Sequence, residues 1–111
     1  MLVAHADTVW DELYEKKPAS QRLISSRNSA GQLTLSGKNK KYGIGADDRA
    51  GCAILWLLRD TGHSLLILNG EESGQQGANY LKNECPDLFK EINQHHFALQ
   101  FDRRNASDYK V

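Results

Sequence analysis

Three short apolar runs limit most strongly what this chain can fold into, because each one is followed within three residues by a histidine or a carboxylate. Runs of four or five apolar residues are typical of strands covered on both faces of a sheet. They are Met1–Ala4 before His5, Leu65–Leu68 before Glu71, and Phe97–Phe101 before Asp102. In open α/β sheets ligands bind at the carboxyl ends of the strands, so we expect these polar side chains to converge.

Helical periodicity fills the intervals between the apolar runs. Apolar residues from Ala50 to Leu58 follow i, i+3, i+4, i+7 spacing, and Gly62 is well placed to end that helix. Residues 75–83 and the stretch from Pro86 to Ile92 predict two further helices. With strands at 1–4, 64–69 and 96–101, the order predicts an α/β fold: a largely parallel or mixed sheet, with right-handed crossovers, flanked by helices.

The remaining stretch, between the first two runs, predicts smaller elements. Residues 10–17 indicate a short helix or a polar excursion, and residues 37–45 a loop. Arg22–Arg27 and Gln32–Ser36 are strand-like on either side of Asn28-Ser29-Ala30-Gly31, which predicts a hairpin.

Length and charge exclude several classes of protein. A chain of 111 residues forms one domain at most, and its 14 basic and 14 acidic residues cancel. No field then favours nucleic acid or an anionic membrane, and the apolar runs are too short to cross a bilayer. Cys52 and Cys85 are interpreted as reduced thiols. Together these features predict a cytoplasmic protein.

Four polar clusters are the candidate functional residues, and each has a simpler explanation. His5 alone predicts a core or surface histidine, Asp47-Asp48 a helix cap, Glu71-Glu72 a solvated turn, and Asp102 an ion pair with Arg103 or Arg104. Each simple explanation is plausible by itself, but a chain without a functional site would need all four of them together. One imidazole and several carboxylates instead suit zinc or a similar divalent metal, with a carboxylate left for proton transfer.

Asp7 and two further histidines add detail to that hypothesis. In an extended segment residues i and i+2 point the same way, so Asp7 can hydrogen bond one imidazole nitrogen of His5 while the other binds metal. The pair His95-His96 is interpreted as solvated, with service as a stand-in metal ligand as the alternative.

The clusters and their neighbours resemble a known family. HADTV (5–9), GIGADDRAG (43–51), NGEESGQQGA (69–78) and FDRRN (101–105) resemble, in family order, the catalytic domain of the co-catalytic zinc exopeptidases. That family comprises aminopeptidases, dipeptidases and related deacylases, and it includes peptidase T and carboxypeptidase G. ADDRAG also resembles the glutamyl-type aminopeptidase branch.

The resemblance implies a role for each matched residue. His5 and Asp102 would bind one zinc, Glu72 the second, and Asp47 would bridge both. Asp7 would orient His5, Asp48 would cap the helix, and Glu71 would be the general base. The implied cofactor is a pair of Zn²⁺ ions, with Co²⁺ or Mn²⁺ as alternatives. The implied substrate is a short peptide or aminoacyl compound, and the reaction is amide hydrolysis.

The departures from the family predict a partial catalytic domain spanning residues 1–111. Family members carry a last histidine ligand well after the aspartate strand, and this chain stops nine residues past Asp102. They also have strands ahead of the His-x-Asp strand. The resemblance therefore implies that activity requires another subunit of a homo-oligomer, or a complementing segment, to supply the missing ligand and pocket walls. The alternatives are a catalytically inactive metal-binding or assembly module and a plain α/β domain without metal.

Overall fold

The computed structural model describes residues 1–9, 23–37 and 44–102. The chain forms two compact units, one of Met1–Asp7 with Asp47–Val111 and the other of Thr8–Ala46, and each is described by itself. The helix or polar excursion predicted for residues 10–17 lies outside the described residues.

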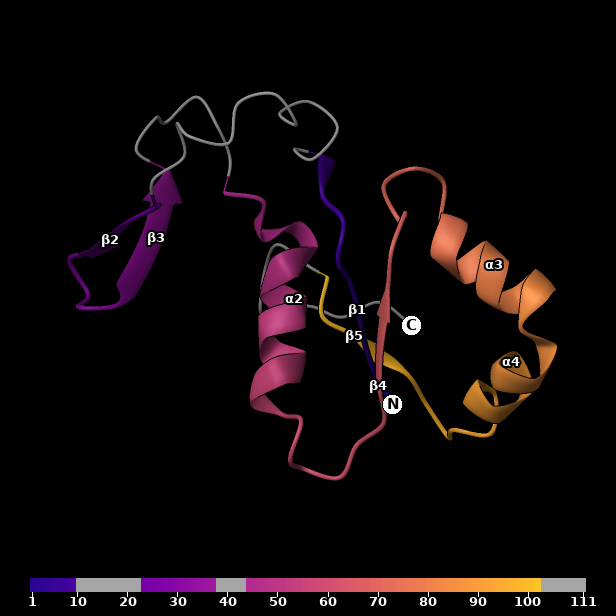
Figure 1. Ribbon diagram of the computed structural model, residues 1–111. Helices are drawn as coiled ribbons and strands as arrows, with labels where there is room; N and C mark the ends of the chain where they lie inside the picture. The colour runs from indigo at the N-terminus through magenta and orange to yellow at the C-terminus, as the bar shows by residue number, and fades with distance from the viewer. Residues whose placement is uncertain (10–22, 38–43, 103–111) are drawn as a thin grey trace. The chain divides into compact units, whose positions relative to one another are not determined.

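A parallel sheet forms the centre of the first unit (Figure 1). Its strands are β1 (Leu2–His5), β4 (Leu65–Leu68) and β5 (Leu99–Gln100), in the order β4-β1-β5. Leu2 of β1 pairs with Leu65 on one side and Leu99 on the other, in both cases in parallel. The predicted α/β class with a parallel sheet is therefore confirmed.

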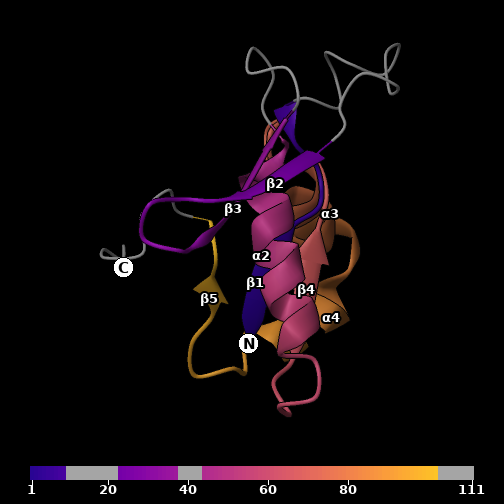
Figure 2. The same cartoon turned by 90° about the vertical axis from the view of Figure 1, so that its left-hand side faces the viewer.

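Helices lie on both faces of this sheet. Figures 1 and 2 show α2 (Ala46–Leu57) on one face, with α3 (Gln76–Glu84) and α4 (Pro86–Ile92) on the other. The backbone angles of Asp47 and Asp48 are not helical, so the regular part of α2 starts after Asp48. The three helices match the predicted segments, although α2 stops at Leu57 and Gly62, with φ of +80°, lies in the turn that follows.

The core lies between β1 and α2. Leu2 and Ala4 alternate along β1 and face the same side, where they pack with Leu55 of α2. The half-buried side chains of Cys52, Leu58 and Phe101 surround this cluster. Leu55 lies in the last turn of α2, and Cys52, one turn earlier, packs on the same cluster and donates to the carbonyl of His5, so the start of α2 lies beside the carboxyl end of β1.

Two predicted strands differ from the structure. Among the described residues β4 is an outer strand of the sheet. Its side chains Leu65 and Ile67 are 38% and 53% exposed, so the prediction that β4 is covered on both faces is wrong. An apolar run does not reveal its place in the sheet, and here β1 takes the centre. The strand expected from His96 begins only at Leu99, because hydrogen bonds from the N–H of Gln94 and His95 to α4 carbonyls turn the chain instead.

The second unit contains the predicted hairpin. Strands β2 (Leu23–Arg27) and β3 (Leu33–Gly37) pair antiparallel, with Arg27 opposite Leu33. The turn between them is organised by Asn28, whose Oδ1 accepts the N–H groups of Ala30 and Gln32. Gly31 adopts the left-handed conformation there, with φ of +77°.

Membrane insertion receives no support from the helices. None of those in the described ranges is long and apolar enough to span a bilayer. Cys52 and Cys85 are both free thiols.

Leu55 should be the most sensitive apolar position of the first unit. Its side chain is 0% exposed, so Leu55→Ala should lower the free energy of unfolding by about 2–5 kcal/mol through lost contacts and a cavity. Leu57→Ala on the same helix is the matched control, because Leu57 is 75% exposed, and it should change stability by less than about 0.5 kcal/mol. Urea denaturation measures both. Equal losses would contradict the placement of the core.

Candidate metal centre

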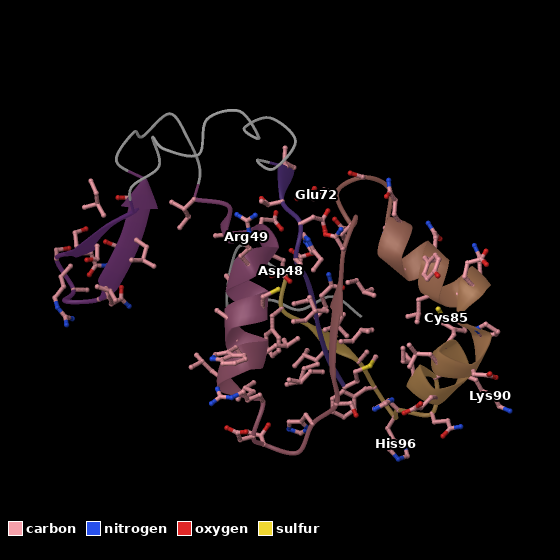
Figure 3. All side chains as sticks on the ribbon, in the orientation of Figure 1. Asp48, Arg49, Glu72, Cys85, Lys90 and His96 are labelled. Atoms are coloured by element: carbon pink, nitrogen blue, oxygen red, sulfur yellow. The ribbon has the colours of Figure 1, made fainter. Side chains whose placement is uncertain are left out.

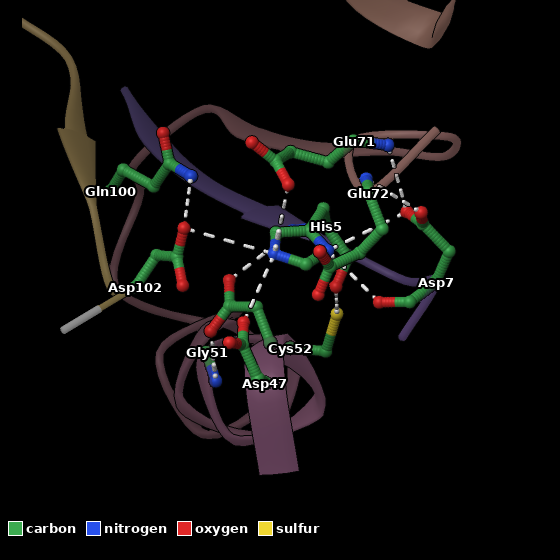
Figure 4. Close-up of polar contacts among 10 residues, drawn as sticks. His5, Asp7, Asp47, Gly51, Cys52, Glu71, Glu72, Gln100 and Asp102 are labelled. Carbon is green, nitrogen blue, oxygen red and sulfur yellow. Dashed lines mark hydrogen bonds and ion pairs between the residues drawn. The ribbon is translucent and has the colours of Figure 1, made fainter. Parts of the chain in front are cut away.

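His5 is the centre of the candidate site. It is the last residue of β1 and is 2% exposed. Its Nε2 lies 3.3 Å from Asp47 Oδ1, 3.7 Å from Asp102 Oδ2 and 4.0 Å from Glu71 Oε2 (Figure 4). The sequence predicted that these side chains would converge, and the structure brings them together from α2, the end of β5 and the loop after β4.

The separations suit ligands that share one ion. Zinc binds nitrogen and oxygen at roughly 2.0–2.2 Å, so two ligand atoms on a tetrahedral zinc lie about 3.4 Å apart. The distances from His5 Nε2 to Asp47 and Asp102 are 3.3 and 3.7 Å, close to that value. These residues can therefore surround one cation after small side-chain movements.

Asp7 orients the imidazole, but mainly through its main chain. His5 Nδ1 lies 2.9 Å from the carbonyl oxygen of Asp7 and 3.5 Å from Oδ1 of its carboxylate. The predicted carboxylate–imidazole hydrogen bond is thus replaced by a carbonyl–imidazole one. A proton on Nδ1 leaves the Nε2 lone pair available, which is the tautomer a metal ligand needs.

The Asp7 carboxylate instead holds the acidic loop. Oδ1 accepts the N–H of Glu71 and Oδ2 that of Glu72, each at 3.1 Å. On the far side of the loop, the N–H groups of Gln76 and Gly77 at the start of α3 donate to the carbonyls of Gly70 and Asn69, at 2.8 and 2.9 Å. These contacts fix both ends of the loop that carries Glu71 and Glu72.

The doubled aspartate divides into one buried and one exposed side chain. The side chain of Asp47 is 70% exposed, whereas Asp48 is 2% exposed. Oδ1 of Asp48 accepts the N–H of Gly51 at 3.0 Å, which is the N-cap hydrogen bond that the sequence predicted. Its Oδ2 also accepts the N–H of His5 at 3.2 Å, a contact that no sequence pattern indicated.

Two more residues support the site without having been predicted. Gln100, the last residue of β5, donates from Nε2 to Asp102 Oδ2 at 3.1 Å (Figure 4). Cys52, in the first turns of α2, donates from Sγ to the carbonyl oxygen of His5 at 3.3 Å. Gln100 lies two residues before Asp102 in an extended segment, so the same-side rule used for Asp7 could have found it. The alternative partners of Asp102, Arg103 and Arg104, lie outside the described residues.

His95 has a different environment. Its Nδ1 contacts the carbonyl of Ile92 at 3.0 Å and its Nε2 contacts Ser64 Oγ at 2.9 Å. Ser64 precedes β4, whereas His5 pairs with Leu68 at the opposite end of that strand. Figure 3 likewise shows His96 at the end of the unit away from Asp48 and Glu72. The alternative that this pair stands in as a ligand at His5 is therefore wrong.

Crowded carboxylates shift proton affinities throughout the site. Burial lowers the pKa of His5, but the hydrogen bond to Asp7 and the nearby negative charges raise it more, to a net value above the ordinary one. Burial and the adjacent Asp47 raise the pKa of Asp102. The pKa values of Asp48 and Glu72 are raised as well, in both cases chiefly by burial.

Asp7 and Cys52 complete this picture. Burial alone would raise the pKa of Asp7, but the hydrogen bonds from Glu71 and Glu72 lower it to a net value below the ordinary one. Asp7 therefore stays ionised at neutral pH. Burial and the charge of Asp48 raise the pKa of Cys52, so its thiol stays protonated and can donate to His5.

In the part of the chain that the structure describes, two groups of three side chains have the spacing to hold a metal ion. One is His5 with Glu71 and Glu72, and the other is His5 with Asp48 and Asp102. Both depend on the same imidazole. Asp48 is the weaker donor of its group, because each of its oxygens already accepts a main-chain N–H. Asp47, whose exposed carboxylate reaches His5, is therefore the aspartate better placed to meet an ion, and Asp48 supports the backbone around it.

A pocket of about 190 Å³ opens beside His5 and Glu71. Val3, Ala4, Leu68 and Ala78 give it apolar walls, and the amide side chains of residues 69, 75 and 100 supply polar ones. Its size is below the roughly 300–1,000 Å³ typical of sites for drug-sized ligands, so it has room for a side chain rather than a large molecule.

Comparisons with other proteins gave no relative. The chain matches no family model, and neither the curated proteins nor the solved structures contain a significant match. The functional interpretation therefore depends on the residues and their geometry.

The raised pKa of His5 predicts that the stability of the metal-free protein falls as pH rises, whereas the stabilisation by zinc grows. In metal-free protein the protonated imidazole stabilises the fold, and that contribution is lost as pH rises through the folded-state pKa. The thermal midpoint should fall between about pH 5.5 and about pH 8. Zinc needs the neutral imidazole, so with saturating zinc the increase in thermal midpoint should be larger at pH 8 than at pH 5.5.

Thermal unfolding at the two pH values, with and without zinc, measures this effect. Calorimetry in buffers of different ionisation enthalpy should show proton release on binding. A zinc-induced stabilisation that is the same at both pH values would mean that His5 does not bind the ion.

Proposed function

We propose that this chain is the metal-binding part of a zinc-dependent hydrolase of the exopeptidase type, related to the co-catalytic zinc exopeptidases. One observation carries the proposal. The buried His5 presents Nε2 to Asp47 and Asp102 at 3.3 and 3.7 Å, with the Glu71 carboxylate 4.0 Å away. A plain α/β domain has no need to gather so many carboxylates at the carboxyl end of one strand, because their repulsion costs stability.

The residues divide into ligands, a base and supports. His5, Asp47 and Asp102 would hold one ion, and three protein ligands are the number that a catalytic zinc uses beside its water. Asp47 and Glu72 would hold a second ion. A metal bound there would lower the pKa of its water and polarise the substrate carbonyl. Glu71 would be the proton acceptor for the attacking water and the proton donor to the leaving amine. Asp7 holds the loop that aims Glu71.

A short peptide or aminoacyl compound fits the surroundings. The pocket beside His5 and Glu71 has apolar and amide walls, and its volume of about 190 Å³ has room for one uncharged side chain. A substrate carbonyl at the metal would place the neighbouring side chain at this opening.

The second ion has the weaker site. Asp47 and Glu72 supply no imidazole, and ligation by carboxylate and water suits harder ions better than zinc. His95 offers no replacement, since it is held at the other end of β4. This imbalance favours, as the second candidate function, a metal-binding or assembly module without turnover.

Titration separates these functions. Calorimetry of metal-stripped protein should show one firm zinc site and a second that fills only at high zinc concentration, and a chromogenic aminoacyl substrate should be turned over negligibly by the monomer. His5→Ala should abolish the firm site, while the matched control His96→Ala should retain it, because His96 lies at the other end of the unit (Figure 3).

Each outcome has a distinct meaning. Zinc binding with turnover in an oligomer or after addition of a complementing segment supports the hydrolase. Firm binding without turnover in any form supports the inactive module. No zinc binding, or binding that survives His5→Ala, overturns the proposal.

A further inference from the structure

The first turn of α2 holds the main chain of His5 from two directions. The N–H of His5 donates to Asp48 Oδ2 at 3.2 Å, and its carbonyl oxygen accepts the Cys52 thiol at 3.3 Å. Asp48 and Cys52 lie one helical turn apart, so both reach the same peptide segment (Figure 4 shows the Cys52 contact). A metal-ligand candidate is thus fixed by its backbone as well as by its ring.

These contacts replace sheet hydrogen bonds that β5 does not provide. Phe101 donates its N–H to the carbonyl of Val3, while Ala6 donates to Leu68 on the β4 side. Main-chain N–H and carbonyl groups of successive residues point to opposite sides of a strand. His5 therefore points these groups towards the β5 side, as Val3 does. No described strand residue pairs with His5 there, because β5 ends at Gln100. Asp48 and Cys52 take the place of that missing partner.

Gly51 makes the approach possible. A Cβ at Gly51 would meet both carboxylate oxygens of Asp48 and its Cγ, so only glycine lets the Asp48 side chain fold back under the helix start. The carboxylate that accepts the Gly51 N–H is therefore held where its second oxygen reaches His5.

We propose that Asp48 and Cys52 are positioning residues that set the placement of His5 relative to Asp47. We call Asp48, Gly51 and Cys52 the His5 clamp. This inference deepens the proposed function, since it concerns the geometry of the same metal site. Asp47 directly precedes the clamp, and its Oδ1 lies 3.3 Å from His5 Nε2. The clamp thus ties two candidate ligands from different elements to the start of α2 before any metal binds.

A carboxylate suits this position better than an amide. Both oxygens of Asp48 accept a main-chain N–H, whereas an asparagine has one oxygen and would turn its NH₂ towards one of the two donors. Asp48→Asn keeps the size of the side chain but breaks half of the clamp. Cys52→Ser keeps a donor to the His5 carbonyl, and Cys52→Ala removes it.

Metal binding tests the clamp in the full 111-residue chain. We expect Asp48→Asn to weaken binding of the firm Co²⁺ or Zn²⁺ ion by about 10-fold, as loss of an outer hydrogen-bond partner does, and to change the visible spectrum of bound Co²⁺. Cys52→Ala should weaken binding by about threefold and Cys52→Ser should restore it. An unchanged affinity and spectrum in Asp48→Asn would overturn the inference. So would loss of binding as complete as that expected for Asp47→Ala, because Asp48 would then be a ligand.

Hydrogen exchange tests it without metal. The amide of His5 should exchange at least about 10-fold faster in Asp48→Asn than in the unchanged chain, while the control amide of Ala6, bonded to Leu68, should not. Equal acceleration of both amides would show a loss of stability alone and overturn the clamp. If the unchanged protein binds no metal, the proposed function fails by itself, and the exchange measurement decides the clamp. If Asp48→Asn does not fold, the Cys52 pair decides it.

Discussion

Asp47→Ala should lose the firm zinc site while keeping the fold. We expect metal affinity to fall by more than about 100-fold, beyond the roughly 10–100-fold that follows loss of an outer hydrogen-bond partner. The side chain of Asp47 is 70% exposed and lies beside other carboxylates, so its removal relieves repulsion on Asp102. The metal-free variant should therefore be as stable as the unchanged chain. Calorimetric zinc titration and urea denaturation measure the two effects.

Asp48→Ala is the matched control, and it should act mainly on stability. An N-cap alone contributes about 1 kcal/mol. Asp48 also accepts the N–H of His5, and it is buried, so its removal leaves two donors without their partner. We expect a loss of about 2–4 kcal/mol. Zinc binding should weaken but persist. Equal loss of zinc in both variants, or loss in Asp48→Ala alone, would mean that the two roles are reversed.

The sequence was sufficient to predict the order of elements and the residues that meet. Apolar runs and helical spacing are local patterns, and the parallel sheet follows from their alternation. Convergence at His5 followed from the rule that parallel strands end at one edge, so Glu71 and Asp102 could be placed together although 31 residues separate them. The hairpin of β2 and β3 followed from its turn residues in the same way.

The sequence was insufficient where a group has several possible hydrogen-bond or strand partners and the tertiary structure selects one of them. Asp7 could offer His5 either a carbonyl or a carboxylate, and only the position of the Glu71–Glu72 loop shows that its carboxylate is taken. The hydrogen bond from His5 to Asp48 depends on how early β5 ends, which no periodicity encodes. The place of β4 at the outside of the described sheet depends on strand order, which an apolar run leaves open.

The charge distribution explains why the site is better understood with a cation. The whole chain is neutral, with 14 residues of each sign, yet carboxylates from four segments meet at one imidazole. The raised pKa values of Asp48, Glu72 and Asp102 show that ionisation of these groups opposes the metal-free fold. Burial is the main cause and repulsion between the carboxylates adds to it, and a divalent ion would offset both through ligation. Sites that are costly to the fold in this way are typical of function.

Glu71→Gln should separate catalysis from metal binding in any form of the protein that turns over substrate. Glu71 comes from a loop fixed by Asp7, and its Oε2 lies 4.0 Å from His5 Nε2, near enough to reach a water on the shared ion. An amide is a similar size but cannot accept and relay a proton. The rate should fall by about 10²–10⁴-fold with the firm ion retained. Steady-state rates and metal analysis on the same samples measure both.

Glu72→Gln is the matched control, because it makes the same change at the adjacent position. The main-chain N–H groups of Glu71 and Glu72 each donate a hydrogen bond to the Asp7 carboxylate. Neither substitution changes these N–H groups, so the loop should keep its conformation in both variants. An amide at residue 72 should weaken the second ion, and added metal should restore part of the lost rate. Added metal should restore nothing in Glu71→Gln, because the missing proton acceptor is not a ligand. Near-normal turnover by Glu71→Gln at full metal occupancy would place the base at another residue.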